Sequence, residues 1–180
     1  WKRENKDSEI ILKESSNRGT LMHGYLSEML MGKMNGELIE EVNLPKKMAE
    51  TIISHGLNDY VKEVYASEEC VYSLKYKYAG TMDALISTQD NKLQICDFKQ
   101  KNSPAKREYS SIRNYFTQCI LYAIAHNEIH RTDIQSCIIL MCTPNLIFQK
   151  FEIEGQEFMD LQKEALERVE HYHQLISKSI

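Results

Sequence analysis

The sequence has 180 residues, of which 42% are hydrophobic and 27% charged, and its formal net charge at pH 7 is −4. This composition is typical of a soluble globular protein and excludes a disordered or fibrous chain. The length suits one domain, residues 1–180. The apolar run 138–142 is far shorter than the roughly 20 residues that cross a membrane, and residues 1–18 contain no apolar secretory segment. We therefore expect a soluble protein without membrane attachment.

The chain contains an odd number of cysteines, five, and none of them forms a CxxC pair. This spacing argues against a zinc site and against a disulfide framework. All five are expected to be small buried hydrophobes in a reducing, intracellular setting, whose compartment the sequence does not specify. They are Cys70, Cys96, Cys119, Cys137 and Cys142.

The first part of the chain is expected to be helical. Polar residues 15–17 are typical of a helix N-terminus, and apolar residues then recur every three or four positions. This pattern predicts a helix from about Gly19 to Met31. A second helical segment is predicted over residues 43–66, where Pro45 suits the first turn.

The pattern then changes to strands. Residues 69–88 alternate with a period of two, which predicts two strands divided near residues 79–80. A turn at residues 90–91 leads into a third strand over residues 92–98. The remaining elements are a helix over 109–127, a buried central strand over 134–142, a strand over 146–153 and an amphipathic helix over 155–176. This order predicts an α/β domain with a small mixed central sheet flanked by helices.

Two carboxylates and a lysine lie near the ends of two predicted strands. If these strands pair through their turn, Asp83 and Asp97 lie at the same end of the hairpin, and Asp97 and Lys99 share a face. Two such carboxylates can hold a hard divalent cation, and the ammonium could orient or deprotonate a water or offset charge on a phosphate. The alternative is a solvated Asp97–Lys99 pair with Asp83 at a strand edge, because the pattern D-x-K is common by chance.

Four motifs between residues 18 and 123 occur in a familiar order. They are "RGTLMHGYLSE" around His23, "GTMD" around Asp83, "ICDFKQ" around Asp97 and Lys99, and "QCILYA" around Gln118 and Tyr122. In order and spacing they resemble the PD-(D/E)xK nucleases, specifically the RecB-like exonuclease branch with its compact mitochondrial and viral members. The resemblance implies a restriction-endonuclease-like core.

The resemblance also implies site residues. The catalytic residues would be Asp83, Asp97, Lys99, Gln118 and Tyr122, and Mg²⁺ or Mn²⁺ would be held by His23, Asp83, Asp97 and the backbone carbonyl of Phe98. Each additional motif has an alternative reading. A histidine on an apolar helix is more often a core residue than a ligand, and Gln118 and Tyr122, four positions apart, could be an ordinary half-buried pair.

The sequence also departs from the family pattern. Met82 stands where the family name has proline, Asp97 replaces the common glutamate with a shorter arm, and Gln100 stands where a small hydroxyl residue is frequent. The cysteines do not reproduce the four-cysteine pattern of the iron–sulfur branches, so no iron–sulfur cluster is expected. Some relatives use an acid near Glu68 and Glu69, but a solvated acid is the favoured interpretation for both.

A basic segment offsets the negative net charge locally. Between residues 99 and 113, Glu108 is the sole acid, and such a cluster can face a phosphate backbone, although many charge runs are simply solvated. Arg18 could contact phosphate or cap its own helix. The expected DNA-binding residues are Lys101, Lys106, Arg107 and Arg113.

Taken together, the motifs predict a metal-dependent exodeoxyribonuclease that hydrolyses phosphodiester bonds by in-line attack of water. Its partner would be DNA with a free end, and single strands are favoured by the resemblance. Two alternatives stay open: an endonuclease acting on DNA or RNA, and a non-catalytic DNA-binding subunit of the same fold. The sequence predicts no particular protein partner.

Overall fold

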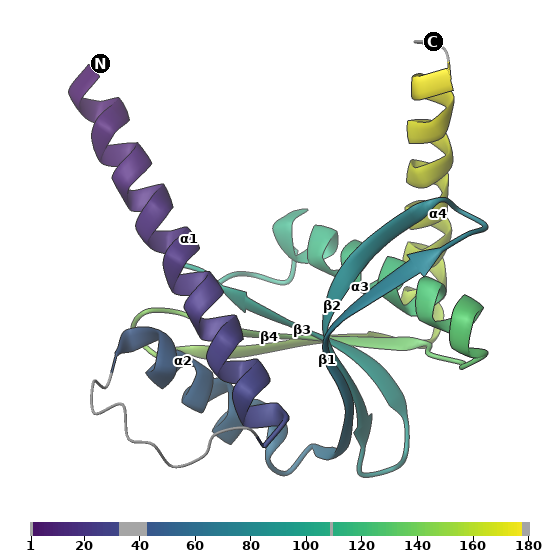
Figure 1. Cartoon of the computed structure of the whole chain (residues 1–180), viewed down its shortest axis with the longest axis horizontal. Helices are drawn as coiled ribbons and strands as arrows, with labels where there is room; N and C mark the ends of the chain where they lie inside the picture. Colours follow the sequence, from purple (N-terminus) through teal and green to yellow (C-terminus); the bar gives the residue numbers. More distant parts are fainter. Residues whose placement is uncertain (1, 33–42, 109, 178–180) are drawn as a thin grey trace.

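Figure 1 shows the computed structural model of the chain, which describes residues 2–32, 43–108 and 110–177. Its helices and strands follow one another in the predicted order: helices, three strands, a helix, two strands and a final helix. The elements are α1 (Lys2–Leu30), α2 (Leu44–Ile52), the short π-helix η1 (Ile53–Leu57), β1 (Val61–Ser73), β2 (Tyr78–Thr88), β3 (Leu93–Gln100), α3 (Ser110–His130), β4 (Ser136–Cys142), β5 (Phe148–Glu154) and α4 (Gly155–Ser177). Among the described helices, none is both long and apolar enough to cross a lipid bilayer.

The strands form one mixed sheet in the order β1-β2-β3-β4-β5. Neighbouring strands are antiparallel except β3 and β4, which are parallel and are connected by α3, because parallel neighbours need a long crossover. Every residue of β4 is buried, which confirms the predicted central strand. The predicted α/β fold with a small mixed sheet flanked by helices is therefore confirmed.

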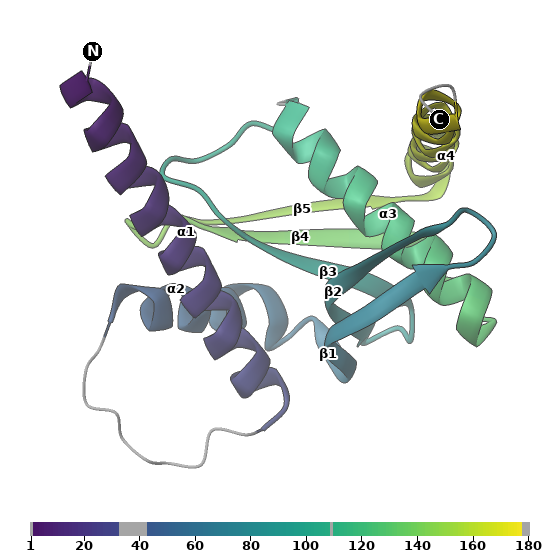
Figure 2. The same ribbon diagram turned by 45° about the horizontal axis from the view of Figure 1, so that its top comes forward.

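The helices form a layer on each face of the sheet (Figure 2), and a hydrophobic core lies between each layer and the sheet. On one face, α1 and α2 pack through side chains such as Met22, Leu26 and Ile52. On the other face, α3 and α4 pack through side chains such as Phe116 and Phe158. The candidate site lies at the end of the β2–β3 hairpin where the two strands diverge, between the helices of the two faces.

The first helix is longer than predicted. It begins at Lys2 rather than near Gly19, because the polar residues expected to cap it continue the helix. The Ser15 hydroxyl accepts a hydrogen bond from Nε2 of Gln100 at 2.8 Å, and the Thr20 hydroxyl donates to the Ser16 carbonyl one turn earlier. The Ser15 and Thr20 hydroxyls therefore form these hydrogen bonds and do not cap the N–H groups of a helix N-terminus.

The second helical segment is shorter than predicted. Asn43 caps α2 by accepting a hydrogen bond from the Lys46 N–H at 3.0 Å, and Pro45 lies in the first turn as expected. The helical segment ends at Leu57, and residues 61–66, predicted to be helical, are strand. Their pairing with β2 decides this outcome, because tertiary contacts override local spacing.

The division between β1 and β2 also differs from the prediction. The strands separate at residues 74–77 and not near residues 79–80. The Glu128 carboxylate determines this turn by accepting hydrogen bonds from the Ser73 hydroxyl and from the Leu74 and Lys75 N–H groups.

The expectation that all five cysteines are buried holds for four of them. Cys70 is exposed on β1, the edge strand of the sheet, and the others are buried.

Candidate active site

Strands β2 and β3 stop pairing immediately beside the two predicted aspartates. Their ladder ends at the pair Ala84 and Cys96, so Asp83 and Asp97 are the next residues on the two diverging strands. The Phe98 N–H, freed from the ladder, donates a hydrogen bond of 2.7 Å to Oδ2 of Asp83. The antiparallel hairpin therefore brings both carboxylates to one end, as the sequence predicted.

Asp97 is nearly inaccessible, with 1% of its surface exposed. Its Oδ1 accepts a hydrogen bond from the Lys99 ammonium at 2.6 Å, whereas its buried Oδ2 has no hydrogen-bond partner among the described residues. Burial raises the pKa of Asp97 to about 7, although the Lys99 charge opposes this shift. A buried carboxylate oxygen without a donor is costly, and a cation is a natural partner for it.

Lys99 is held between the carboxylates and helix α3. Its ammonium lies 5.1 Å from the centroid of the Tyr115 ring, in a cation–π contact. Burial lowers the pKa of Lys99, but the negative charges of Asp97 and Asp83 outweigh it, and the net pKa is raised. The ammonium therefore keeps its proton at neutral pH in the metal-free protein.

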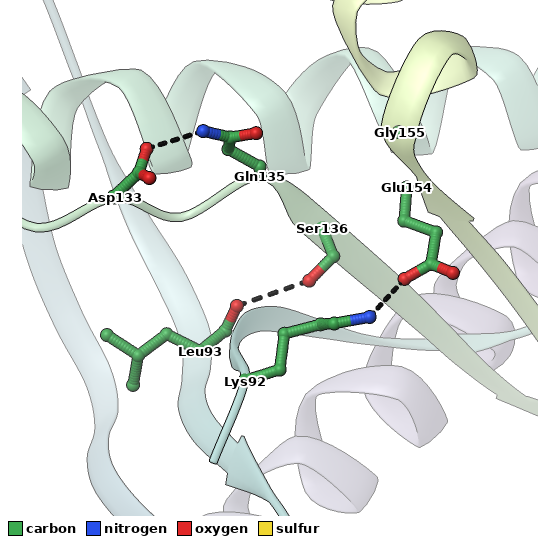
Figure 3. Close-up of a pocket in the computed structure, with 7 residues that line it drawn as sticks. All are labelled: Lys92, Leu93, Asp133, Gln135, Ser136, Glu154 and Gly155. Carbon is green, nitrogen blue, oxygen red and sulfur yellow. Dashed lines mark hydrogen bonds and ion pairs between the residues drawn. The ribbon is translucent and has the colours of Figure 1, made fainter. Parts of the chain in front are cut away.

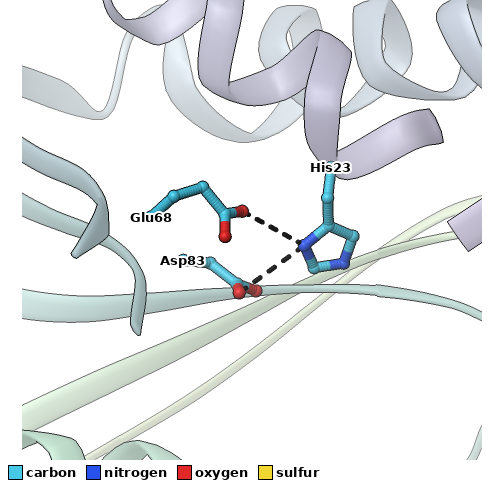
Figure 4. Close-up of side chains that lie close together, drawn as sticks. All are labelled: His23, Glu68 and Asp83. Carbon is cyan, nitrogen blue, oxygen red and sulfur yellow. Dashed lines mark ion pairs between the residues drawn. The ribbon is translucent and has the colours of Figure 1, made fainter. Parts of the chain in front are cut away.

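A second group of side chains meets at Asp83 (Figure 4). Nδ1 of His23, from α1, lies 3.5 Å from Oδ1 of Asp83 and 3.7 Å from Oε1 of Glu68, from β1. One ligand atom from each residue lies within 4.8 Å of the others, so the three could hold a metal ion. The predicted ligand His23 is thus beside Asp83, across from Phe98, whose ring it meets edge-on at 6.2 Å.

The charges of this group favour a charged histidine. Burial lowers the pKa of His23, but the hydrogen bond to Asp83 and the charges of Asp83 and Glu68 raise it overall. Burial raises the pKa of Asp83, but His23 and Lys99 outweigh burial, and the net pKa is lowered. Burial and the neighbouring Asp83 raise the pKa of Glu68. Without a metal, the histidine thus partly neutralises the two acids.

Glu68, for which the sequence favoured a solvated acid over a metal ligand, lies in this group beside His23 and Asp83. Its neighbours Ser67 and Glu69 pair with Ala84 and Met82, so the register places Glu68 beside Asp83. Its φ of 53° lies in the left-handed region, which is unfavourable for a residue other than glycine. The resemblance indicated an acid near residues 68–69, and the pairing of β1 with β2 decides that Glu68 is the one beside Asp83.

Gln118 and Tyr122 lie on the face of α3 next to the site. Nε2 of Gln118 donates a hydrogen bond of 2.6 Å to the Tyr122 hydroxyl, as their spacing of four allows. The charges of Asp97, Asp83 and Lys99 all act on the Tyr122 hydroxyl, whose pKa is raised mainly by burial. A Cβ on Gly80 would lie only 2.6 Å from the Tyr122 ring, so a glycine is required at this close approach.

A hollow of about 490 Å³ opens onto the His23 and Glu68 side chains. Small residues of α1, namely Gly19, Thr20 and Gly24, line the rest of it. Two glycines inside a helix lower its stability, but here they leave space beside the possible metal ligands. The hollow gives a ligand direct access to this part of the site.

Arg18 does not act as a helix cap. Its Nε donates to Oε1 of Gln100 at 3.1 Å, and it also donates to the Asn102 side chain. A guanidinium has five N–H donors, so this network leaves some of them for another acceptor. The arrangement holds the positively charged Arg18 guanidinium beside the end of β3.

The predicted DNA-binding residues are dispersed over the loop after β3 and the start of α3. Arg107 and Arg113 form surface ion pairs with Glu157 and Glu164 of α4. Such exposed pairs are weak and can exchange partners. Of the other two, Lys101 donates a hydrogen bond to Ser111, and Lys106 is exposed.

Another hollow of about 400 Å³ lies at the opposite ends of the strands (Figure 3). Its polar groups satisfy one another: Lys92 pairs with Glu154, and the Ser136 hydroxyl donates to the Leu93 carbonyl. None of the predicted site residues lines it. The candidate functional site is therefore the group of side chains at the diverging end of β2 and β3.

The helix-flanked mixed sheet, which opens between β2 and β3 beside two aspartates and a lysine, is a fold that is also found among solved structures. A candidate exonuclease from Eubacterium rectale has a similar structure, with a TM-score of 0.58 and 19% sequence identity. The similarity covers 89% of this chain and 66% of that protein, so the chain spans slightly less than two thirds of its length.

An alkaline exonuclease from Laribacter hongkongensis also matches, with a TM-score of 0.36 and 13% identity over 87% of this chain and 83% of that protein. No protein-family model and no curated protein matches the sequence. The similarity to the Eubacterium rectale structure confirms the predicted α/β fold, a mixed sheet flanked by helices.

Proposed function

We propose that the chain is a metal-dependent deoxyribonuclease, an exonuclease that hydrolyses phosphodiester bonds at DNA ends and prefers single strands. One observation carries this proposal: the buried Oδ2 of Asp97 accepts no hydrogen bond within the described part of the chain, beside Asp83 and the Lys99 ammonium. The name of the structurally similar protein from Eubacterium rectale, a candidate exonuclease, and the sequence motifs support the end preference.

The donor set fits a divalent cation. His23, Glu68 and Asp83 offer one nitrogen and two kinds of carboxylate oxygen, and Asp97 adds an oxygen that has no other partner. The Phe98 carbonyl would complete the set. An imidazole ligand suits Mn²⁺ better than Mg²⁺, whereas carboxylates suit both. A bound ion would lower the pKa of a water and offset charge on the phosphate.

The residues of the chain would supply orientation and charge. The Lys99 ammonium is fixed by Asp97 at 2.6 Å and keeps its proton, so it can donate to a phosphate oxygen or a water but not accept a proton. Gln118 and Tyr122 would hold the opposite wall of the site through their hydrogen bond. In the metal-free protein, a proton on Asp97 would compete with ion binding, because a ligand carboxylate must be ionised.

The remaining predictions belong to the same proposal. Residues 1–180 would act as one nuclease domain, and the basic side chains would contact the phosphate backbone of the substrate. These side chains are Lys101, Lys106, Arg107 and Arg113.

The test is degradation of end-labelled single-stranded, duplex and circular DNA in Mn²⁺, Mg²⁺ or EDTA, with the native chain and with Lys99→Ala. Lys163→Ala, an exposed lysine of α4, is the matched control. We expect metal-dependent loss of linear but not circular DNA, abolished by Lys99→Ala and unaffected by Lys163→Ala.

Other outcomes would favour the alternatives. Cutting of circular DNA, or of RNA, would identify an endonuclease. Binding of DNA without cleavage under any metal would identify a non-catalytic subunit, and cleavage by Lys99→Ala at the native rate would place the chemistry elsewhere.

A further inference from the structure

Three adjoining hollows form a continuous depression between the β1–β2 turn and α4. Figures 1 and 2 show the turn at residues 74–77 reaching toward α4, and His173 of α4 contacts the Tyr76 carbonyl through Nε2 at 2.9 Å. The hollows have volumes of about 370, 270 and 520 Å³, and each shares lining residues with the next. We call this depression, bounded by residues 74–79 and 165–177, the hairpin trough.

The trough begins beside the candidate active site. Gln118 and Tyr122 line its first hollow, and Asp97 and Lys99 act electrostatically on the Tyr122 hydroxyl. Arg168 lines both the first and the second hollow, and Lys77 both the second and the third. A chain lying in the trough would therefore pass directly from these two cations to the wall of the site.

The cations of the trough are available to a ligand. Lys77 is exposed, and no carboxylate of the described ranges lies within ion-pair distance of it. Arg168 is also exposed, and toward the described residues it makes one long hydrogen bond, 3.4 Å to Asn114, which leaves most of its donors unused by them. Lys75 adds a third positive charge at the far end, and Glu170 is the acid that lines the same hollow.

Aromatic and apolar surface lies between these cations. Tyr172 is 60% exposed and lines the middle hollow together with Tyr78. The Tyr78 hydroxyl donates to the Leu121 carbonyl at 2.7 Å, so its ring is held in place. An exposed tyrosine ring between cations can stack on a planar base while the cations contact phosphates.

We propose that the hairpin trough binds a single strand of nucleic acid, with phosphates on Lys77 and Arg168 and a base on Tyr172. The proposal rests on the proposed nuclease function, whose substrate this strand would be. The occupant is inferred from the alternation of cations with an exposed ring and from the continuity with the site. An acidic peptide would match the charges but would leave the ring without a planar partner.

The experiment measures binding by fluorescence anisotropy in EDTA. The probe is a labelled oligothymidylate of about 16 nucleotides, long enough for an extended site. Lys77→Gln/Arg168→Gln should weaken binding about tenfold at low salt. It should also make the salt dependence less steep: the negative slope of log association constant against log salt concentration should shrink by about 1.4, because each phosphate contact to a single strand contributes about 0.7. The matched control, Lys13→Gln/Lys163→Gln, removes two exposed charges outside the trough and should leave the affinity unchanged.

The stacking step has its own test. Tyr172→Ala should weaken oligothymidylate binding at least about fivefold but leave binding of an abasic oligomer of equal length unchanged. An equal loss with both probes would exclude stacking. Three outcomes would overturn the proposal. Lys77→Gln/Arg168→Gln could bind with native affinity, the control variant could lose as much affinity, or the two substitutions could weaken binding of duplex DNA as much as binding of the single strand.

Binding in EDTA separates this proposal from the proposed function. Trough-dependent binding by a chain that cleaves no substrate would retain the trough and reject the nuclease. Conversely, the chain could cleave DNA in a way that Lys99→Ala abolishes, while its DNA binding does not depend on Lys77 and Arg168. This result would support the nuclease proposal and contradict the trough proposal.

Discussion

The Phe98 N–H donates a hydrogen bond of 2.7 Å to Oδ2 of Asp83, across the point where β2 and β3 stop pairing. The backbone of one strand thus orients the carboxylate of the other. Oδ1 of Asp83 remains directed toward His23, 3.5 Å away. Because the two strands diverge here, the Phe98 N–H is free of the β2–β3 ladder and orients the Asp83 carboxylate, a possible metal ligand.

Replacing Asp83 by asparagine should separate structure from chemistry. Asparagine retains an acceptor for the Phe98 N–H, so we expect the free energy of unfolding to change by less than about 1 kcal/mol. Metal-dependent cleavage should fall more than about 100-fold. Loss of a residue that only supports a metal ligand lowers activity by about 10- to 100-fold, and loss of the ligand itself should cost more. Thermal unfolding and DNA degradation measure the two effects. Asp83→Ala also removes the acceptor and should cost stability, about 1–3 kcal/mol; native cleavage by Asp83→Asn would contradict its role.

Replacing Glu68 by glycine should stabilise the fold while weakening metal binding. Its φ of 53° costs an L-residue about 1–2 kcal/mol, so glycine should raise the free energy of unfolding by about 1 kcal/mol. The same change removes the carboxylate that Glu68 contributes to the group of His23, Glu68 and Asp83. Calorimetric titration with Mn²⁺ and chemical denaturation in EDTA test both parts. Glu68→Ala is the control, since it removes the carboxylate but keeps the strained backbone; unchanged Mn²⁺ affinity in both variants would exclude Glu68 as a ligand.

Replacing Gly24 by alanine should stabilise α1 but hinder the substrate. A Cβ at this position would meet nothing within 4 Å, and alanine improves helix propensity by about 1 kcal/mol. The added methyl group would project into the hollow beside His23. We expect a higher unfolding temperature together with slower cleavage of DNA. Slower cleavage accompanied by a lower unfolding temperature would instead indicate damage to the helix.

Replacing Gly80 by alanine should disturb the wall formed by Tyr122. The new Cβ would lie 2.6 Å from the ring, which must shift and strain its hydrogen bond with Gln118. We expect a loss of about 1–3 kcal/mol in the free energy of unfolding. A double-mutant cycle with Tyr122→Ala checks the cause, because without the ring the added methyl group should cost much less. An equal cost in both backgrounds would attribute the loss to the strand backbone.

The β1–β2 turn should contribute stability that depends on pH. The hydrogen bonds that Glu128 accepts from Ser73 and from the N–H groups of Leu74 and Lys75 lower its pKa below 4.5. A lowered folded-state pKa means that this stability is complete above the unfolded pKa and is lost as the pH falls through the folded pKa. Unfolding temperatures of native chain and Glu128→Gln should therefore differ at pH 7 and converge in acid.

The matched control for this turn is Glu167→Gln, an exposed glutamate of α4. It should unfold like the native chain at each pH. A gap between native chain and Glu128→Gln that persists below the folded pKa of Glu128 would show that packing, and not charge, holds the turn.

The sequence alone determined the order of the elements and the approach of Asp83 to Asp97. Both depend on short-range information: the period of apolar residues, and a tight turn that joins two neighbouring strands. The pair Asp97 and Lys99 follows from the same pleat, since residues two apart share a face. These features needed no knowledge of distant contacts.

The tertiary structure decided what distant segments contribute. The packing of α1 on the sheet brings His23 to Asp83, and the register of β1 on β2 brings Glu68 to the same place. The strand pairing of residues 61–66 overrode their helical spacing for the same reason. Helix docking and strand register depend on apolar surface buried between segments far apart in the chain, and local periodicity carries no measure of that burial.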